Sequence, residues 1–587
     1  MVKDFIGLLR KVLHRLSHHQ LLMVCSVLVG LWSGGMAVVL KLLAHYIQDS
    51  LVRNEYGALF YSVFPTLGIL GTVIITLIFF RDKLEKGSYQ VLYAIARKSS
   101  RIPRQQTYSH VITSAVTVGL GGSAGLESPI VQTGAAVGST FGGLVQLSYK
   151  DRTLLIGCGA AAGIAAAFNA PIAGVLFALE VLLSQVSVSA FIPIILAGAT
   201  GALCSKIILN EDILLSFHLQ QPFDYLNTGY YILLGVLCGL YSAYYIKTYE
   251  RAERLLSFTE NPWVKVLAGG FLLGVLILLF PPLFGEGYAS IRNLGNLRPD
   301  MIFSGSLIAP YLTHASLIAV FLVLVLMLKV WATAITLSAG GNGGNFAPSL
   351  FAGGVLGFTF VFVLNQLQIT QTPVANFTLV GMCGVLTGIF HAPLTGIFLI
   401  AEITGGYDLI IPLMIVAAIS LSVSRYIQPK SLDAMKLMQK GHEHTHDQDA
   451  HILNTMPIDN LIENDFAIVY VHEKLGDLVK RISQSRRNTF PVVDEDRRLK
   501  GIIQLDDVRD KIFRTELYEE LAVKDIMQPV PDKISVDEKM VTVMEKFDRT
   551  KAWNLPVVKH NRYLGFVSKS KIFTEYRKRL QEQSLDF

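Results

Sequence analysis

A single acidic side chain stands between apolar stretches in the first third of the chain. Glu127 belongs to the phrase Gly-Leu-Glu-Ser-Pro over 125–129. An ionisable side chain inside a membrane costs much free energy, which makes Glu127 a candidate functional residue. The simpler alternative is a carboxylate that caps the start of a helix.

A matching phrase, Gly-Asn-Phe-Ala-Pro over 344–348, has the same G-x-x-x-P spacing. Glycine permits close approach and unusual backbone angles, and proline favours the first turn of a helix. Each phrase therefore predicts a helix N-terminus whose unpaired N–H groups carry partial positive charge. Two such ends that converge would bind an anion inside the membrane, whereas one alone could be a break in a packed helix.

A second pair of phrases shows that the chain repeats itself. Phe-Asn-Ala-Pro over 168–171 is followed by Glu180, and Phe-His-Ala-Pro over 390–393 is followed by Glu402 at the same spacing. In each half a G-x-x-x-P phrase precedes this pair. Two related halves with apolar segments broken by Gly and Pro in corresponding places are typical of a transporter with its substrate site between the repeats.

The composition places most of these phrases in lipid. Of 587 residues, 51% are hydrophobic and only 16% are charged, which lies outside the usual globular range. Some apolar stretches approach the roughly 20 residues of a spanning helix, and the broken ones predict half-spanning helices buried in protein. The stretches are 21–43, 59–80, 154–183, 190–208, 264–284, 316–337, 377–399 and 409–423.

Charge and composition divide the chain into a membrane part and a soluble part. Residues 1–19 form a basic amphipathic segment without the features of a cleavable signal, which favours a cytoplasmic N-terminus. The membrane domain is expected over 20–435 and a polar, His-rich linker over 436–454.

The net charge of +6 is modest for this length, so we expect no nucleic-acid partner. The five cysteines show no paired spacing and are interpreted as core residues.

The soluble part contains its own two-copy repeat. Phe-Pro-Val-Val at 490–493 returns as Leu-Pro-Val-Val at 555–558, and each copy predicts a helix (475–485; 539–549) before this strand. The pattern resembles a pair of CBS domains, here 455–515 and 523–580. Such pairs usually regulate a neighbouring catalytic or transport unit.

The membrane phrases together resemble the CLC family of chloride channels and chloride/proton exchangers. Residues 125–134 are similar to its G-(R/K)-E-G-P-x-V-Q element, 343–348 to its G-x-F-x-P element and 168–180 to its helix around A-F-N-A-P. The resemblance implies an all-α polytopic membrane domain of two inverted, pseudo-symmetric halves with broken helices, followed by the α/β CBS pair. It also implies a homodimer in which each copy has its own anion pathway.

By this resemblance Glu127 is the gating glutamate, whose carboxylate competes with chloride and moves aside on protonation. Gly125, Asn345, Phe346 and Ala347 are expected to bind the anion through the two helix starts. Leu126 replaces the usual basic residue beside Glu127, so the outer vestibule is expected to be less positive and to capture anions more slowly at low salt.

Other positions depart from the family pattern. Val181 stands where proton-coupled members carry a second glutamate, and valine cannot carry a proton. Asp433 falls at the place of a family tyrosine that holds the central anion, where an inward-pointing acid would repel chloride. In the region of the family's G-S-G-I-P element, either Ser88 offers its hydroxyl to the anion or Lys86 falls on the site.

These departures set the order of the functional hypotheses. Because of Val181, and because no other buried carboxylate is an obvious proton carrier, a chloride channel gated by Glu127 is the first hypothesis and chloride/proton exchange the alternative. The expected partners are chloride and related anions, the lipid bilayer and a second copy of the chain. The protein is expected in the cell membrane, multi-pass, with the N-terminus and CBS domains cytoplasmic, and not to be an enzyme.

A hypothesis from another class rests on His-Glu-His-Thr-His at 442–446, which satisfies the H-E-x-x-H pattern of zinc proteases. An intramembrane metalloprotease with CBS domains would need this phrase on a helix within a shielded cavity. Here it lies in a polar linker, so a solvated segment is the preferred interpretation and no metal site is predicted.

The CBS pair raises the question of a nucleotide ligand. The resemblance suggests adenine nucleotide binding through a strand followed by S/T-x-x-D. The first copy keeps Asp507 without the hydroxyl, and the second keeps Ser568 without the carboxylate. Each is half a site, so no cofactor is predicted and a structural or dimerising role is preferred.

Overall fold

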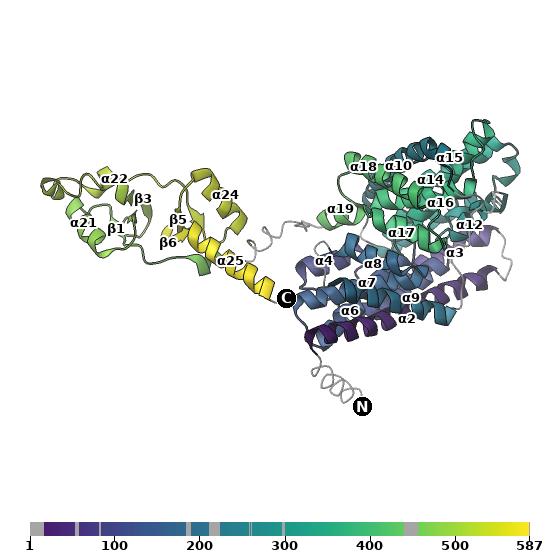
Figure 1. The fold of residues 1–587 in the computed structure, drawn as a ribbon, viewed down its shortest axis with the longest axis horizontal. Coiled ribbons are helices and arrows are strands. Elements are labelled where there is room, and N and C mark those ends of the chain that lie inside the picture. Colours follow the sequence, from purple (N-terminus) through teal and green to yellow (C-terminus); the bar gives the residue numbers. More distant parts are fainter. Residues whose placement is uncertain are drawn as a thin grey trace, which may run out of the picture. The chain divides into compact units, whose positions relative to one another are not determined.

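The computed structural model describes residues 17–52, 58–80, 84–183, 190–209, 223–256, 259, 261–295, 300–303, 305–439, 453 and 456–585. The chain divides into two units, Met1–His444 and Thr445–Phe587. The first is a bundle of helices and the second combines helices with short strands (Figure 1).

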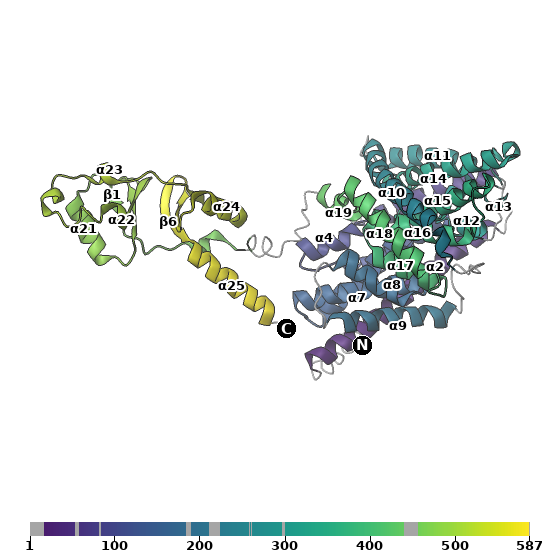
Figure 2. The same cartoon turned by 45° about the horizontal axis from the view of Figure 1, so that its top comes forward.

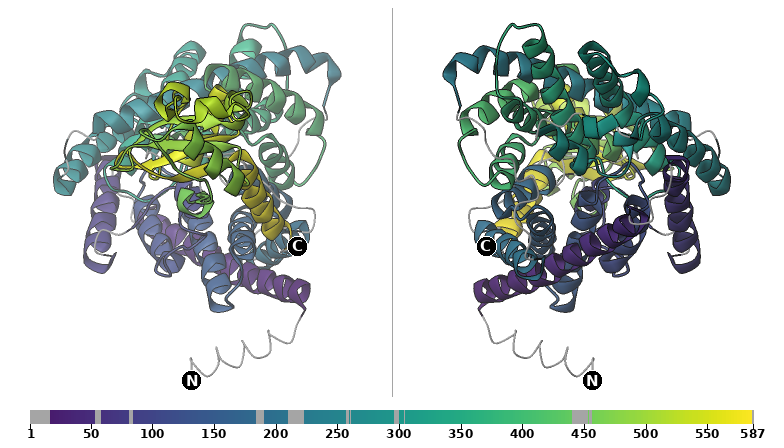
Figure 3. Two further views of the ribbon diagram at one scale, coloured as in Figure 1. Left: turned by 90° about the vertical axis from the view of Figure 1, so that its left-hand side faces the viewer. Right: turned by 90° about the vertical axis from the view of Figure 1, so that its right-hand side faces the viewer.

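The first half of the membrane unit opens with the long helix α2, which packs on α5, α6, α7 and α9 and is purple in Figure 3. Its elements are α2 (His18–Val52), α3 (Ala58–Phe80), α4 (Tyr89–Arg97), α5 (Gln106–Gly119), α6 (Glu127–Leu144), α7 (Tyr149–Phe168), α8 (Pro171–Phe177), the π-helix η1 (Ala178–Leu182) and α9 (Phe191–Leu209).

The second half repeats the central packing, with α15 on α16 as α6 is on α7. Its elements are η3 (Tyr225–Asn227), α10 (Thr228–Leu256), α11 (Pro262–Leu279), η4 (Pro281–Leu283), α12 (Tyr288–Gly295), α13 (Asp300–Phe303), η5 (Ala309–Tyr311), α14 (Ala315–Ser338), α15 (Phe346–Gln366), α16 (Val374–Phe390), α17 (Pro393–Ile403), α18 (Ile410–Ile427) and α19 (Leu432–Gln439). Because α19 continues to Gln439, residues 436–439 belong to this unit and not to the predicted linker.

Within the described residues, nine helices are long and apolar enough to cross a membrane. Two of them, Tyr225–Leu256 and Phe346–Gln366, were not among the predicted apolar stretches. The first carries many tyrosines and a charged end, which lower its hydropathy, and the second begins inside the G-x-x-x-P phrase.

Two predicted stretches are broken helices. In 154–183, α7 ends at Asn169, whose φ of 55° is left-handed, and Pro171 begins α8. In 377–399, His391 with φ 57° and Pro393 repeat this break between α16 and α17. A left-handed residue ends a helix and a proline can only begin the next, so the repeated phrase encodes the same break twice.

The two short helices are joined by reciprocal carboxylate contacts. Glu180, which follows α8, accepts the N–H groups of Leu394 (3.0 Å) and Thr395 (2.8 Å) at the start of α17. Glu402, near the end of α17, accepts those of Ile172 (3.0 Å) and Ala173 (2.8 Å) at the start of α8.

In each contact the C-terminal end of one short helix meets the N-terminal end of the other, so the two run antiparallel, as related elements of an inverted repeat must. Figures 1 and 2 both place α8 beside α17. The predicted fold class is confirmed, including the inverted relation of the halves.

Small residues let the central helices approach each other closely. A Cβ on Gly134 of α6 would lie 2.1 Å from the carbonyl oxygen of Gly159 on α7, and a Cβ on Gly357 of α15 would lie 2.0 Å from that of Phe377 on α16. Neither position can hold a larger residue without moving backbone. This contact fixes α6 and α15, whose first residues form the site described below.

The second unit consists of two similar copies. The first contains η6 (Ile458–Leu461), β1 (Val469–Tyr470), α21 (Leu475–Gln484), β2 (Thr489–Val493), β3 (Leu499–Gln504) and α22 (Leu505–Val508), and it is followed by η7 (Thr515–Tyr518). The second contains α23 (Val523–Ile526), β4 (Ile534–Ser535), α24 (Met540–Thr550), β5 (Asn554–Lys559), β6 (Arg562–Ser568) and α25 (Lys569–Leu585).

The copies share register as well as order. Each sheet has three strands, a parallel pair followed by an antiparallel pair, and Val492 faces Gly501 as Val557 faces Gly565. Glu463 and Phe566 exchange both backbone hydrogen bonds (2.8 and 3.0 Å), which joins the segment before the first sheet to the second sheet. The predicted two-copy repeat and its strands are confirmed.

Candidate functional site

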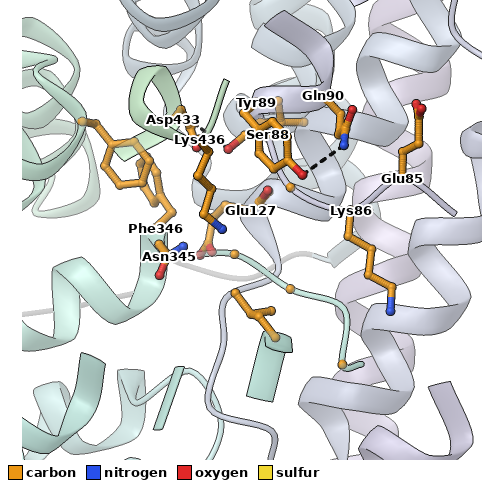
Figure 4. A pocket seen from close by; sticks show the side chains of 18 of the residues that line it. Glu85, Lys86, Ser88, Tyr89, Gln90, Glu127, Asn345, Phe346, Asp433 and Lys436 are labelled. Carbon is orange, nitrogen blue, oxygen red and sulfur yellow. Dashed lines mark hydrogen bonds between the residues drawn. The ribbon is translucent and has the colours of Figure 1, made fainter. Parts of the chain in front are cut away.

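A cavity of about 410 Å³ in the membrane unit brings several of the predicted site residues together. Ser88, Glu127, Asn345, Phe346 and Asp433 all line it, although they come from separate parts of the sequence (Figure 4). The residues that supply polar side chains to its wall lie at or near the starts of α4, α6 and α15 and on α3, α10 and α19.

The starts of α6 and α15 are held together by paired backbone groups. The N–H of Gly125 donates to the carbonyl oxygen of Gly344 (2.9 Å), and the N–H of Gly344 donates to that of Gly125 (2.8 Å). A Cβ on Gly125 would lie 2.8 Å from the Cβ of Ala347, so the approach requires glycine. The two predicted helix ends therefore converge, and their partial positive charges add at one place.

Glu127 places its carboxylate at this convergence. Its side chain is only 3% exposed, and Oε1 accepts the hydroxyl proton of Tyr288 at 2.6 Å. A Cβ on Gly125 would lie 2.2 Å from Oε2 of Glu127 and 3.0 Å from the backbone nitrogen of Ala347, so Oε2 lies against both helix starts. The carboxylate thus lies where the two helix ends would hold a dissolved anion.

The aromatic ring of Phe346 anchors the start of α15. Its centroid lies 5.7 Å from that of Phe168, 6.0 Å from Phe177 and 5.5 Å from Phe390. Phe168 and Phe390 are the first residues of the repeated phrase, so both halves contribute to the anchor. The preceding residue, Asn345, accepts the Tyr245 hydroxyl through Oδ1 at 3.0 Å.

Ser88 and Asp433 meet at another part of the cavity wall. The Ser88 hydroxyl donates to Oδ2 of Asp433 at 2.6 Å, and the side chains are 8% and 6% exposed. Lys86 also lines the cavity, but its ammonium group donates to the carbonyl oxygen of Gly340 (2.6 Å) and points away from Ser88 in Figure 4. Asp433 therefore lies on the cavity wall. This is the inward position in which, by the sequence analysis, an acidic group would repel chloride.

Val181 lies in η1 and packs against the apolar core. It does not line the cavity, and the carboxylate beside it, Glu180, is committed to the start of α17. The sequence offered no other buried carboxylate as an obvious proton carrier, and the structure places a second buried carboxylate, Asp433, in the same cavity as Glu127. Its burial depends on contacts between residues far apart in the sequence.

Several polar residues around the site were not predicted. Lys436, also on the cavity wall, donates to the Tyr249 hydroxyl at 3.0 Å and lies 3.5 Å from a carboxylate oxygen of Glu253. Lys436 lies one helical turn after Asp433, so the sequence spacing alone could have indicated that the two side chains share one face of a short helix.

Two further ionisable groups lie behind Glu127. Oε1 of Glu286 accepts the N–H of Leu126 at 3.1 Å. Lys329 is fully buried and donates to the Ser123 hydroxyl (3.0 Å) and the carbonyl oxygen of Gly285 (3.1 Å). Lys329 is the one charged residue of the apolar sequence of α14, and that isolation was a usable sign of a buried polar network.

In the second unit, Asp507 is exposed in α22. The Ser568 hydroxyl donates to Glu463 at 2.9 Å and accepts the N–H of Lys571 at 3.1 Å, so it already has partners within the protein. The H-E-x-x-H phrase at 442–446 lies outside the described residues. Among the residues that the structure describes, no cluster of three or more His, Cys, Asp or Glu could hold a metal ion.

Comparison with known proteins agrees with this geometry. Residues 67–425 match the family described as voltage gated chloride channel, and 458–514 and 523–578 each match the CBS domain. A ClcB-like chloride channel protein of Ralstonia nicotianae is 30% identical over 56% of this chain and 74% of its own length. The H(+)/Cl(-) exchange transporter ClcA of Vibrio cholerae is 29% identical over 51% of this chain and 62% of its own length.

Among solved structures, a slow cyanobacterial Cl-/H+ antiporter is similar with a TM-score of 0.61 and 22% identity, covering 72% of this chain and 98% of that one. At this identity the likeness supports the fold. It agrees with the arrangement of broken helices around one cavity described above.

Replacing Tyr288 by Phe tests the position of the Glu127 carboxylate. The variant removes the hydroxyl that holds the carboxylate at the helix ends, and a hydrogen bond to a charged group contributes about 1.5–3 kcal/mol. We expect chloride to bind about tenfold more tightly in calorimetry, because its competitor is held less firmly.

The control is Tyr244→Phe, which removes a hydroxyl that donates to the carbonyl oxygen of Met327 (3.1 Å). It should leave chloride affinity unchanged. Equal affinities in the two variants, or weaker binding in Tyr288→Phe, would contradict the assignment.

Proposed function

Because the chain belongs to the voltage gated chloride channel (CLC) family of anion transport proteins, we propose that it exchanges chloride for protons across the cell membrane, with Glu127 as the proton-binding group that competes with chloride. The observation that carries the proposal is the Glu127 carboxylate held between the starts of α6 and α15. Chloride, the lipid bilayer and a second copy of the chain are its proposed partners.

The competition follows from charge. The helix ends provide partial positive charges, which favour any anion at their meeting point, whether dissolved or tethered. Protonation makes Glu127 neutral, so it loses this attraction and leaves the N–H groups to chloride. Partial charges replace the hydration of chloride without the strong trapping of a full ammonium or guanidinium pair.

Exchange is preferred over the passive conduction that the sequence placed first. A relative and a solved structure of similar fold are named as exchanging protons for chloride, and the cavity contains a second carboxylate, Asp433. Passive conduction gated by Glu127 remains the second candidate, because Val181 carries no proton and a relative from Escherichia coli is named a voltage-gated chloride channel.

The assembly and orientation are part of the same proposal. Helices α8 and α17 have 7 and 11 residues, too few to span a bilayer, and Leu394 on α17 and Ile411 on α18 are 45% and 53% exposed. A second copy packed on this face would cover them. The basic residues of 1–19 support a cytoplasmic N-terminus, and the CBS unit is proposed on the same side.

Glu127→Gln imitates the protonated carboxyl group permanently. In liposomes we expect chloride efflux at neutral pH to rise by about tenfold, since the variant removes a charged hydrogen-bonded competitor, and proton movement coupled to chloride to disappear. A chloride electrode and a pH-sensitive dye measure both.

The matched control is Glu85→Gln, a cavity-lining carboxylate that pairs with Lys98. It should keep both fluxes. If Glu127→Gln retained the original efflux and coupling, the assigned role would be wrong.

Tryptophan at both Leu394 and Ile411 tests the dimer. Bulky rings on this face should convert the detergent-solubilised protein from dimer to monomer, as measured by light scattering. Phe271→Trp, at a 73% exposed site on α11, should leave the mass unchanged. A monomeric unaltered protein would refute the dimer.

The cytoplasmic location of the CBS unit is tested with protease added outside intact cells. Cleavage of the CBS unit under these conditions would refute that location.

A further inference from the structure

We propose that Asp433 is a second tethered carboxylate, which occupies an anion position at Ser88 and accepts the transported proton on the side of the membrane unit that leads to the CBS domains. The inference rests on the proposed exchange function. It is carried by the Ser88–Asp433 hydrogen bond of 2.6 Å inside the cavity that also contains Glu127.

Neither side chain of this pair is needed to cap its helix. Asp433 lies in the first turn of α19, but the Ser431 hydroxyl accepts the N–H of Ala434 there (3.4 Å). Ser88 is the residue before α4, and its hydroxyl makes no capping hydrogen bond. The hydroxyl and the carboxylate are thus directed at each other across the cavity wall.

A serine hydroxyl on such a wall is a donor suited to an anion. In this structure Ser88 holds the carboxylate of Asp433 in place of a dissolved anion. In the same way, the carboxylate of Glu127 lies at the starts of α6 and α15. The cavity therefore contains two resident carboxylates, each at a place where chloride could bind.

A cation lies close to Asp433 along α19. Lys436 lies one turn further along α19, where Tyr249 and Glu253 of α10 hold its ammonium group. Tyr89, at the start of α4, contributes its ring to the same ammonium at 5.7 Å. A nearby cation favours an ionised carboxyl group, whereas burial favours the protonated form, so Asp433 is placed to gain and lose a proton within the cavity.

The proposed step conserves charge and protons. Asp433 binds one proton from the water on the side where the chain leaves for the CBS domains and becomes neutral. Ser88 then donates its hydroxyl to chloride in place of the carboxylate. Water molecules in the polar cavity pass the proton to the Glu127 carboxylate, which becomes neutral, and Asp433 regains its negative charge.

This assignment explains how exchange can proceed with Val181 in the chain. The position of Val181 lies outside the cavity lining, whereas Asp433 lies on it. A proton acceptor on α19 therefore needs no carboxylate in η1.

The test compares unaltered protein with Asp433→Asn and Glu85→Gln in liposomes, with chloride and proton fluxes measured together. The neutral amide cannot bind a proton, so Asp433→Asn should keep chloride flux and reduce the protons moved per chloride by about tenfold or more. It should also bind chloride about tenfold more tightly, because a charged rival is removed from Ser88. Glu85→Gln removes a cavity-lining carboxylate that pairs with Lys98, and it should change neither quantity.

Unchanged coupling in Asp433→Asn would overturn the proton-acceptor role of Asp433. Unchanged chloride affinity would overturn its place at an anion position beside Ser88. Unaltered protein that moves no protons would instead refute exchange, and the proton-acceptor role with it, while chloride affinity would still decide whether Asp433 occupies an anion position. If Asp433→Asn does not fold, Ser88→Ala serves: it should retain coupling and should not bind chloride more tightly, and loss of coupling would contradict the assignment.

Discussion

The backbone pairing of Gly125 with Gly344 is the interaction on which the rest of the site depends. It holds the start of α6 against the start of α15, so that partial charges from two helices act at one point. Neither helix end alone would replace the water that an anion loses inside a membrane. The tight contacts of α6 with α7 and of α15 with α16 fix these ends, and Phe346 anchors one of them on residues from both halves.

The inverted repeat relates the start of α6 to that of α15 and the start of α8 to that of α17, and the two pairs of helix starts have different partners. The starts of α8 and α17 are permanently occupied by Glu402 and Glu180, each supplied by the opposite half. The starts of α6 and α15 share Glu127, which is also held by a tyrosine and can be neutralised by one proton. The same electrostatics thus stabilises the fold at one pair of helix ends and, in the proposed function, creates a reversible site at the other.

The sequence was most informative where local chemistry determines structure. Proline after a Phe-x-Ala phrase predicts a helix break, and a lone acid in an apolar setting predicts a functional side chain, so the repeat, the broken helices and Glu127 could be inferred. The pairing of Ser88 with Asp433 could not, because their contact joins residues 345 positions apart. For the same reason Tyr288 was not recognised as the partner of Glu127, and the tyrosine-rich α10 was missed because its hydropathy is lower than that of its neighbours.

The central claim is that one anion position lies between the starts of α6 and α15 and that Glu127 competes for it. Bromide scatters anomalously and resembles chloride, so crystals of the Glu127→Gln variant grown in bromide locate the anion directly. The account predicts a bromide peak within hydrogen-bonding distance of the Ala347 N–H, and a weaker peak there in the unaltered protein at neutral pH. Bromide found only elsewhere, or bound equally at that point in both proteins, would contradict it.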